Sequence, residues 1–377
     1  MTPPAHTARP GRYRRVALSI LMVGTLAGPV AAQTAAFAPA VNFPAGDGSF
    51  GVVAADLNGD GSLDLASANL YSNDVSVLMG DGAGGFAAPV NFPVGDVPGG
   101  LVAADLNGDG MLDLATSNLE SNDVSVLMAD DADGFAETLS VPTGEGPLGL
   151  VAADLDGDGM LDLATSNLSS NDVSVLMGDG AGGFAAPVNF PVGDVPSGLV
   201  AADLDGDGML DLATSNFFSN DVSVLLADGA GGFAATATFP TGNGPRGIAA
   251  ADLNGDTHPD LTTGNRHSND VSVLTGDGAG GFAAPVNLPT GANVVFQVVA
   301  ADLNGDGSLD LATPNFGSDD VSVLMGDGAG GFAAPVNFPV GDGPRRIIAA
   351  DLNGDTHPDL ATGNEISGDV SVLVNTT

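Results

Sequence analysis

Seven short acidic segments carry the clearest chemistry in this sequence. The first, residues 56–64, has oxygen-bearing side chains at its positions 1, 3, 5 and 9: Asp56, Asn58, Asp60 and Asp64. Carboxylates held ~5 Å apart repel by ~3 kcal/mol per pair at an effective dielectric constant of ~20. A hard divalent cation reverses that repulsion, and calcium accepts oxygen ligands in a more flexible geometry than Mg²⁺ does. The segment therefore predicts a calcium loop, with the backbone carbonyl of position 7 as a further ligand.

The same loop recurs along the chain at intervals of 49, 49, 49, 49, 50 and 49 residues. The seven loops occupy residues 56–64, 105–113, 154–162, 203–211, 252–260, 302–310 and 351–359. The predicted metal ligands, counting the carbonyl at position 7, are Asp56, Asn58, Asp60, Ser62, Asp64, Asp105, Asn107, Asp109, Met111, Asp113, Asp154, Asp156, Asp158, Met160, Asp162, Asp203, Asp205, Asp207, Met209, Asp211, Asp252, Asn254, Asp256, His258, Asp260, Asp302, Asn304, Asp306, Ser308, Asp310, Asp351, Asn353, Asp355, His357 and Asp359. We expect up to seven Ca²⁺ ions.

Four loops depart from the common pattern. The fifth and seventh have Thr257 and Thr356 where the others have glycine, and a β-branched residue is penalised if the turn needs a positive φ. We expect these two loops to bind calcium more weakly. The third and fourth carry Asp156 and Asp205 in place of Asn, which adds one carboxylate to each. The alternative for the whole set is a series of acidic hairpins that only keep the protein soluble.

Each repeat contains four strand-like runs and nothing that reads as a helix. In the first repeat these runs are 52–55, 65–68, 74–79 and 86–92, with the acidic loop between the first two and a glycine-rich turn between the last two. Pro89 fits the fourth run only at a sheet edge, because proline donates no hydrogen bond to a ladder. The repeat therefore predicts one four-stranded antiparallel blade of an all-β, seven-bladed β-propeller.

The two ends of the chain are complementary pieces of one repeat. The chain stops after the third run of the seventh repeat, and the missing fourth run stands at the front, in residues 37–44. We expect this N-terminal strand to complete the last blade and close the ring. The alternative architecture, an open solenoid, would need distinct capping repeats at its two ends.

The N-terminal residues and the composition of the chain predict a protein that is exported. Residues 1–32 run from an Arg-rich start through an apolar stretch to small residues, the order of a secretory signal peptide, although a retained anchor is an alternative. Residues 33–377 then form one propeller domain with four Arg against 47 acids, a formal charge of −43. This charge argues against nucleic acid or an anionic membrane as the main partner, and we expect no membrane insertion after signal cleavage. Because Cys is absent, stability must come from packing or metal. We expect a monomer that is secreted, periplasmic or on the cell surface.

The repeats resemble FG-GAP repeats of the VCBS type, the family that builds the propeller of integrin α-subunits. The similar elements are V-A-A-D-L-N-G-D-G-x-L-D-L-A, N-D-V-S-V-L and G-D-G-x-G-G-F, and the resemblance covers about residues 37–377. It implies a seven-bladed propeller with calcium in the loops of one face. No catalytic set of residues emerges, so we expect a non-catalytic binding or adhesion module for a protein or glycan. The alternative is a polysaccharide lyase or hydrolase with a site in the central channel.

The ligand should lie on the face opposite the acidic loops, where the repeats differ from one another. In an antiparallel blade, the bend between the second and third strands and the link between blades share that face. The arginines at these positions, and the aromatic residues that we expect to be exposed there, are Phe50, Tyr71, Phe218, Arg246, Arg266, Phe296, Arg345 and Arg346. Arg and aromatic residues are enriched at binding hot spots, so we expect an acidic or glycan-like ligand there. The alternative is random drift among tolerant loop residues.

Overall fold

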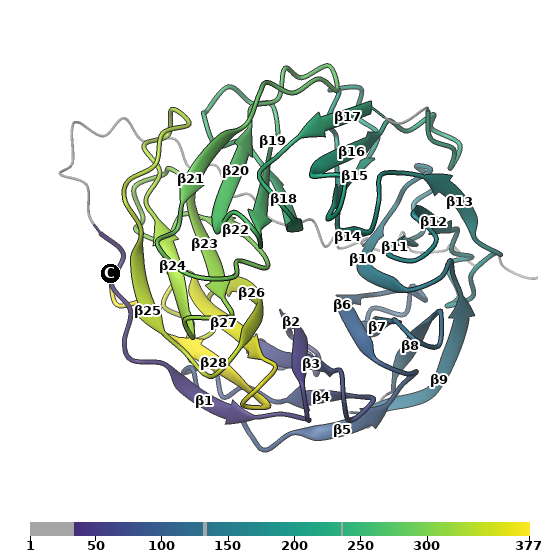
Figure 1. The fold of residues 1–377 in the computed structure, drawn as a ribbon. Helices are drawn as coiled ribbons and strands as arrows, with labels where there is room; N and C mark the ends of the chain where they lie inside the picture. Colours follow the sequence, from purple (N-terminus) through teal and green to yellow (C-terminus); the bar gives the residue numbers. More distant parts are fainter. Residues whose placement is uncertain (1–33, 131–133, 235–236) are drawn as a thin grey trace, which may run out of the picture. The chain divides into compact units, whose positions relative to one another are not determined.

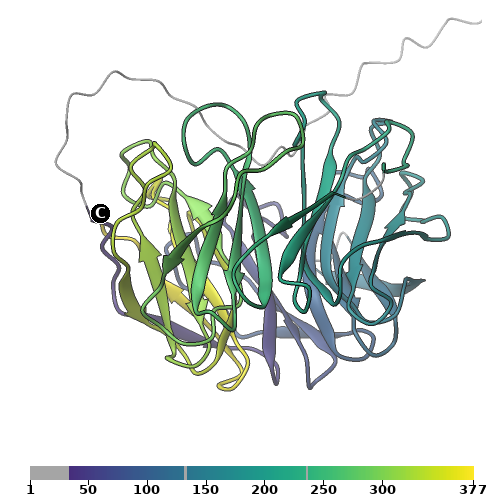
Figure 2. The same cartoon turned by 45° about the horizontal axis from the view of Figure 1, so that its top comes forward.

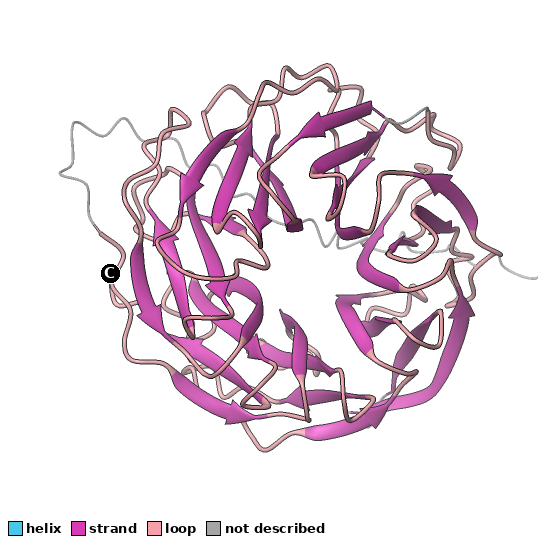
Figure 3. Ribbon diagram, viewed as in Figure 1, coloured by secondary structure: helices cyan, strands magenta, loops and turns pink. Residues whose placement is uncertain are grey.

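The computed structural model describes residues 34–130, 134–234 and 237–377. In these residues the chain forms 28 β-strands and no helix, arranged as seven four-stranded antiparallel sheets in a ring (Figures 1 and 3). This confirms the predicted seven-bladed β-propeller. Figure 2 shows loops extending from both ends of the strands, so the ring has two faces.

The strands follow one pattern in every blade, and we number the blades one to seven along the chain. Blades one to four comprise β2 (Ser49–Ala55), β3 (Asp64–Asn69), β4 (Asp74–Leu78), β5 (Val90–Pro93); β6 (Pro98–Ala104), β7 (Asp113–Asn118), β8 (Asp123–Asp130), β9 (Gly134–Pro142); β10 (Pro147–Ala153), β11 (Asp162–Asn167), β12 (Asp172–Leu176), β13 (Val188–Pro191); and β14 (Pro196–Ala202), β15 (Asp211–Asn216), β16 (Asp221–Leu225), β17 (Ala237–Pro240). Blades five to seven comprise β18 (Pro245–Ala251), β19 (Asp260–Asn265), β20 (Asp270–Leu274), β21 (Val286–Pro289); β22 (Val299–Ala301), β23 (Asp310–Asn315), β24 (Asp320–Leu324), β25 (Val336–Pro339); and β26 (Pro344–Ala350), β27 (Asp359–Asn364), β28 (Asp369–Leu373), β1 (Val41–Pro44).

The hydrophobic core lies between blades. The second strand of each blade is buried along its whole length, as β3 illustrates, because neighbouring blades cover both of its faces. Leu65 and Leu78 of blade one are inaccessible to solvent and pack with Val370 and Val372 of blade seven. Each blade therefore completes its core only against its neighbours, and the ring must close for every interface to form.

The fourth strand is shorter than the sequence suggested. The run 86–92 was expected to be one strand, but β5 begins at Val90, after Pro89, and Phe86 forms only an isolated bridge with Gly80. Pro89 has no N–H group to donate to the ladder, but blade four has the same isolated bridge, Ala227 with Phe233, although Thr236 stands at the equivalent position. Blade two has Thr138 at the position of Pro89, and its fourth strand, β9, is continuous from Gly134. The predicted edge position is confirmed, because β5 is the outermost strand of its sheet.

The first strands surround the central channel (Figure 1) and approach one another closely. A Cβ atom added to Gly51 would lie 2.2 Å from the carbonyl oxygen of Gly99 in the next blade. The equivalent atom on Gly100 would lie 2.4 Å from the oxygen of Leu148. Glycine is therefore required at this level of the channel wherever two first strands are in such contact.

The N-terminal strand closes the ring as predicted. β1 pairs antiparallel with β28 at the edge of blade seven, with Val41 opposite Val372 and Pro44 opposite Asp369. The ring of Phe43 meets that of Phe86 in blade one edge to face, with centroids 5.2 Å apart. The last blade is thus built from both ends of the chain.

The predicted signal peptide, residues 1–32, lies outside the described residues. Among the residues that the structure describes, no helix has the length and apolar character needed to cross a membrane.

Removing residues 33–46 tests the closure. The deletion takes away β1, leaves the edge of β28 unpaired and exposes apolar surface between blades six, seven and one, which promotes aggregation. We expect aggregates in size-exclusion chromatography and loss of a single cooperative thermal transition. A chain that begins at Thr34 keeps β1 and serves as the control. A deletion variant that stays monomeric with an unchanged melting temperature would contradict the closure.

Candidate functional site

Each acidic loop is a compact turn whose side-chain oxygens accept hydrogen bonds from its own backbone. In blade two, Asp105 at position 1 accepts from the N–H groups of Gly108 (2.7 Å) and Gly110 (3.0 Å). Asn107 Oδ1 accepts from the N–H of Asp109, and Asp109 Oδ1 accepts from the N–H of Met111. These bonds turn the oxygens of positions 1, 3 and 5 toward the inside of the loop.

The Asp at position 9 is buried and connects the loop to the rest of the blade. Asp113 is inaccessible to solvent; its Oδ2 accepts from the N–H of Leu106 at 2.9 Å and its Oδ1 from the N–H of Ala129 at 2.8 Å. The other six blades repeat this pair of bonds. Burial raises the pKa of all seven carboxyls, and it raises that of Asp310 to about 6.

The oxygens of the loops fit a hard cation. In blades three and four, where position 3 is Asp, one oxygen each of positions 1, 3 and 9 lies within 4.8 Å of the others: Asp154, Asp156 and Asp162, and Asp203, Asp205 and Asp211. In blade one, Asp56 Oδ1 is buried and has no hydrogen-bond partner among the described residues. A buried carboxylate oxygen without a donor is costly, and a divalent ion would satisfy it.

The glycine-rich turns cover the loops from two sides, on what we call the loop face. Within blade three, Met160 at position 7 lies against Gly180 of the turn, within 2.7 Å of a Cβ added to that glycine. The same turn reaches the preceding blade, where Gly182 lies beside Asn107. The loop of one blade and the turn of the next therefore share a boundary, which confirms that loops and turns lie on one face.

The two threonine-containing loops keep the same conformation at a cost in strain. Thr257 and Thr356 have φ values of 72° and 76°, where the glycines of the other loops lie at 88–92°. The N–H of Thr257 still donates to Asp252 Oδ2 at 2.8 Å, as Gly110 does to Asp105. The turn thus requires a positive φ, and a β-branched residue there stores about 1–3 kcal/mol.

The opposite face carries the bends between second and third strands and the links between blades, and we call it the bend face. There the arginines and aromatic rings meet as expected. The Arg345 guanidinium lies 4.1 Å from the ring centroid of Phe296 and 4.2 Å from that of Phe316, and its Nε pairs with the Glu365 carboxylate. Arg266 lies 5.2 Å from the Phe296 ring. Blades five, six and seven are therefore bridged by cation–π contacts.

Two more arginines complete this cluster. Arg246 lies 4.1 Å from the ring of Phe217, and Arg346 lies 5.4 Å from that of Phe50. Burial is the main cause that lowers the pKa of Arg246 and that of Arg346 to about 10, and repulsion from neighbouring arginines adds to it. Both stay charged at pH 7, so the described part of the chain concentrates all its arginines in one partly desolvated region.

The aromatic residues divide into buried and exposed sets. The prediction that Phe50 and Phe296 are exposed is wrong: they are 8% and 7% exposed, because arginine side chains cover them. Tyr71 and Phe218 are exposed at 66% and 65%, as expected. The buried rings support the arginines, and the exposed rings are available to a ligand.

Sequence reasoning missed four members of the cluster. Phe217 and Phe316 support arginines, Glu365 accepts hydrogen bonds from both Tyr71 and Arg345, and Gln297 lies in the channel. The bend residues were visible as differences between repeats. Gln297 could have been found because the equivalent residue in blades one to five is glycine.

The repeats identify the family of the chain. Residues 56–116, 154–214, 215–263 and 252–313, more than half of the chain together, match the FG-GAP-like repeat. The protein therefore belongs to the FG-GAP repeat family, as the sequence motifs predicted. No curated protein matches the sequence.

Solved structures with the same fold share little sequence with this chain. Virginiamycin B lyase from Staphylococcus aureus is 13% identical, with a TM-score of 0.64 over 90% of this chain and 99% of the lyase. A lectin from Agrocybe aegerita, specific for non-reducing terminal N-acetylglucosamine, is 20% identical, with a TM-score of 0.56 over 77% of this chain and 80% of its own. BBS1N, solved in complex with ARL6DN, is 13% identical, with a TM-score of 0.64 over 90% of this chain and 97% of its own. These likenesses show the fold alone.

The buried carboxyls predict how stability depends on pH when no divalent cation is available. A carboxyl whose pKa is raised by folding stabilises the protein below its unfolded pKa, near 3.8, and that stabilisation is lost as pH rises through the folded pKa. In a chelator we therefore expect the melting temperature to rise as the pH falls from 7 to 5. The Asp310→Asn variant should show a weaker dependence, since its folded pKa of about 6 lies in this range. A melting temperature that falls over the same interval would contradict the assignment.

Proposed function

We propose that the protein is an exported, calcium-binding β-propeller that acts as a non-catalytic binding module for an extracellular protein or glycan. The observation that carries this proposal is the difference in residue content between the two faces of the ring. The loop face repeats one acidic turn in every blade, whereas the bend face gathers all the arginines of the described chain beside exposed aromatic rings. A scaffold maintained by cations on one face leaves the other free to vary for recognition.

Calcium is supported by the chemistry of the loops. The oxygens of positions 1, 3 and 9 converge within 4.8 Å in blades three and four, and Asp56 Oδ1 lacks a donor in blade one. These residues, with the carbonyl of position 7, would hold the ion, and the ion would neutralise carboxylates that form no ion pair with any arginine of the described residues. Extracellular calcium modules work at dissociation constants of about 10⁻⁴–10⁻³ M, which suits a chain that carries an export-like N-terminus.

Two features favour binding over catalysis. Among the described residues, the central cavity is lined by glycine, Val, Leu, Ile, Gln and Arg. This lining provides no pair of carboxylic acids of the kind that glycosidases use. Tyr71, exposed on the bend face, would be a poor proton acceptor for a lyase. Its hydroxyl donates a hydrogen bond to Glu365. This bond is the main cause, and burial the second, that raises the pKa of Tyr71 above its ordinary value of 10.0.

Calcium should act as a folding ligand. At millimolar free calcium and a dissociation constant near 10⁻⁴ M, each site would add ~1.4 kcal/mol, and seven sites on the order of 10 kcal/mol. We expect a large fall in melting temperature in chelator, restored by Ca²⁺ more effectively than by Mg²⁺. Asp156→Asn gives loop three the composition of loop two and should lower the calcium affinity of one site in calorimetric titration. Asn107→Asp makes the reverse change in loop two and should raise the calcium affinity of one site. Thermal melts that do not change in chelator would refute the role of calcium.

The bend face should carry recognition. On a glycan array and in binding assays with candidate extracellular proteins, all in millimolar calcium, we expect Arg246→Ala or Arg345→Ala to weaken an acidic ligand by about tenfold or more, because each removes a charged donor. Asp81→Ala, on an exposed turn of the loop face, is the control and should leave binding unchanged. Equal losses from both faces would rule out the bend face as the site.

A further inference from the structure

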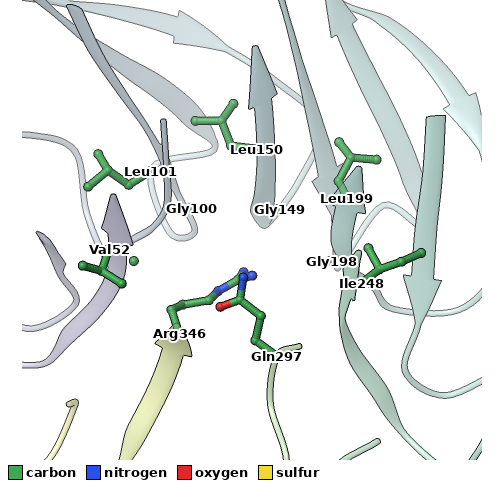
Figure 4. Close-up of a pocket in the computed structure, with 11 residues that line it drawn as sticks. Val52, Gly100, Leu101, Gly149, Leu150, Gly198, Leu199, Ile248, Gln297 and Arg346 are labelled. Carbon is green, nitrogen blue, oxygen red and sulfur yellow. The ribbon is translucent and has the colours of Figure 1, made fainter. Parts of the chain in front are cut away.

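The central channel contains a small cavity that two blades fill differently from the rest. Its volume is about 120 Å³, and it is lined by residues of all seven blades, in or just before their first strands (Figure 4). Five residues before each acidic loop, blades one to five have Gly51, Gly100, Gly149, Gly198 and Gly247, blade six has Gln297 and blade seven has Arg346. Figure 4 shows the side chains of Arg346 and Gln297 extending into the space that the glycines leave.

Both side chains offer hydrogen-bond donors to this cavity. Gln297 Oε1 accepts from the N–H of Ile347 at 2.8 Å, so its amide nitrogen is left to donate and has no partner within the described residues. The Arg346 guanidinium forms no ion pair or hydrogen bond with any residue that the structure describes. Outside the cavity lining, on the same face, Arg246 has a buried Nε atom that lacks an acceptor in the described chain. The unpaired N–H groups of Gln297 and Arg346 are open to the cavity, and a set of donors that includes a cation can hold an anion through charge-assisted hydrogen bonds.

The surroundings limit how large that anion can be. The links between blades carry exposed acids on the bend face, namely Asp47, Asp96, Glu145, Asp194 and Asp342. These carboxylates would repel a polyanion laid across the face. At the links into blades five and six the acids are replaced by the exposed amides Asn243 and Asn293. The rim is therefore neutral on the side where Arg266 lies, and a ligand with a single charge can approach there.

The groups near this neutral side suit a sugar. Phe218 is 65% exposed, and its ring lies 5.0 Å from that of Phe217, which supports Arg246. The amides of Asn243 and Asn293 can both donate and accept hydrogen bonds, as hydroxyl groups require. An exposed ring and neutral amides around a cationic cavity match an oligosaccharide that carries one acidic residue among uncharged ones.

We infer that the channel mouth on the bend face binds a single carboxylate of an acidic sugar residue, with Arg346 and Gln297 as the donors that hold it. This inference rests on the proposed binding function and specifies its ligand. An acidic peptide would offer the same carboxylate, and the experiment below separates the two.

Calorimetric titration of the whole protein in millimolar calcium tests the inference with four probes: D-glucuronate, a glucuronate-bearing oligosaccharide, the matching neutral oligosaccharide, and an acidic hexapeptide. We expect binding of the two glucuronates, no binding of the neutral probe and weaker binding of the peptide. Arg346→Gln, which introduces the side chain that blade six already accommodates, should weaken glucuronate binding by at least about tenfold. Ala83→Glu is the control: it makes the same change in net charge at an exposed turn of the loop face and should leave binding unchanged.

Three results would overturn the inference: equal binding of glucuronate by the wild type and Arg346→Gln, equal losses in Arg346→Gln and Ala83→Glu, or tightest binding of the peptide. A thermal melt of Arg346→Gln that matches the wild type shows that the fold is intact. If calcium still stabilises the protein and another ligand still depends on Arg246, the inference fails while the proposed function survives.

Discussion

Every blade depends on one buried carboxylate, the Asp at position 9 of its acidic loop. In blade one, Asp64 accepts the N–H of Leu57 inside the loop and the N–H of Gly80 at the start of the glycine-rich turn. A single side chain thereby fixes the two connections of the loop face relative to the second and third strands. Because burial raises the pKa of this group, its negative charge is costly at neutral pH unless positive charge is near. The interaction that builds the blade therefore also supports the proposal of a bound cation.

The same connections carry one blade to the next. The turn that Asp162 holds in blade three reaches back to Asn107 in blade two, through Gly182. At the rim, Phe92 of blade one meets Phe135 of blade two edge to face, at 5.2 Å between centroids. Interfaces of this kind repeat around the ring, so stability is shared among neighbours and closure by β1 gives the seventh blade the edge strand that the others already have.

The two faces differ in how far their residues can vary, because the turns of the loop face need more side-chain oxygens than the links of the bend face do. On the loop face, side-chain oxygens define the turns, so their residue types can hardly change. On the bend face, one side chain of the preceding bend holds the link into each of blades two to seven: the N–H of Val97 donates to Asn73 Oδ1, and the N–H of Gly146 donates to Asn122 Oδ1. The other side chains of the links and bends are then free to vary. Arginines and aromatic rings accumulate in blades five to seven without disturbing the repeat.

The sequence by itself determined the repeat, the blade and the closure. Spacing of 49 or 50 residues, the period of the strands and the fragment at residues 37–44 left one consistent architecture, because these features are local and recur seven times. It also placed the arginines on one face, since strand order alone fixes which connections share a face. Only the tertiary structure decided that Phe50 is buried beneath Arg346, that the fourth strand of blade one begins at Val90, and that Gln297 reaches Ile347 in the neighbouring blade. The contacts of Phe50 and Gln297 depend on the distance and tilt between blades, which arise from packing around the whole ring and leave no periodic signal in any one repeat.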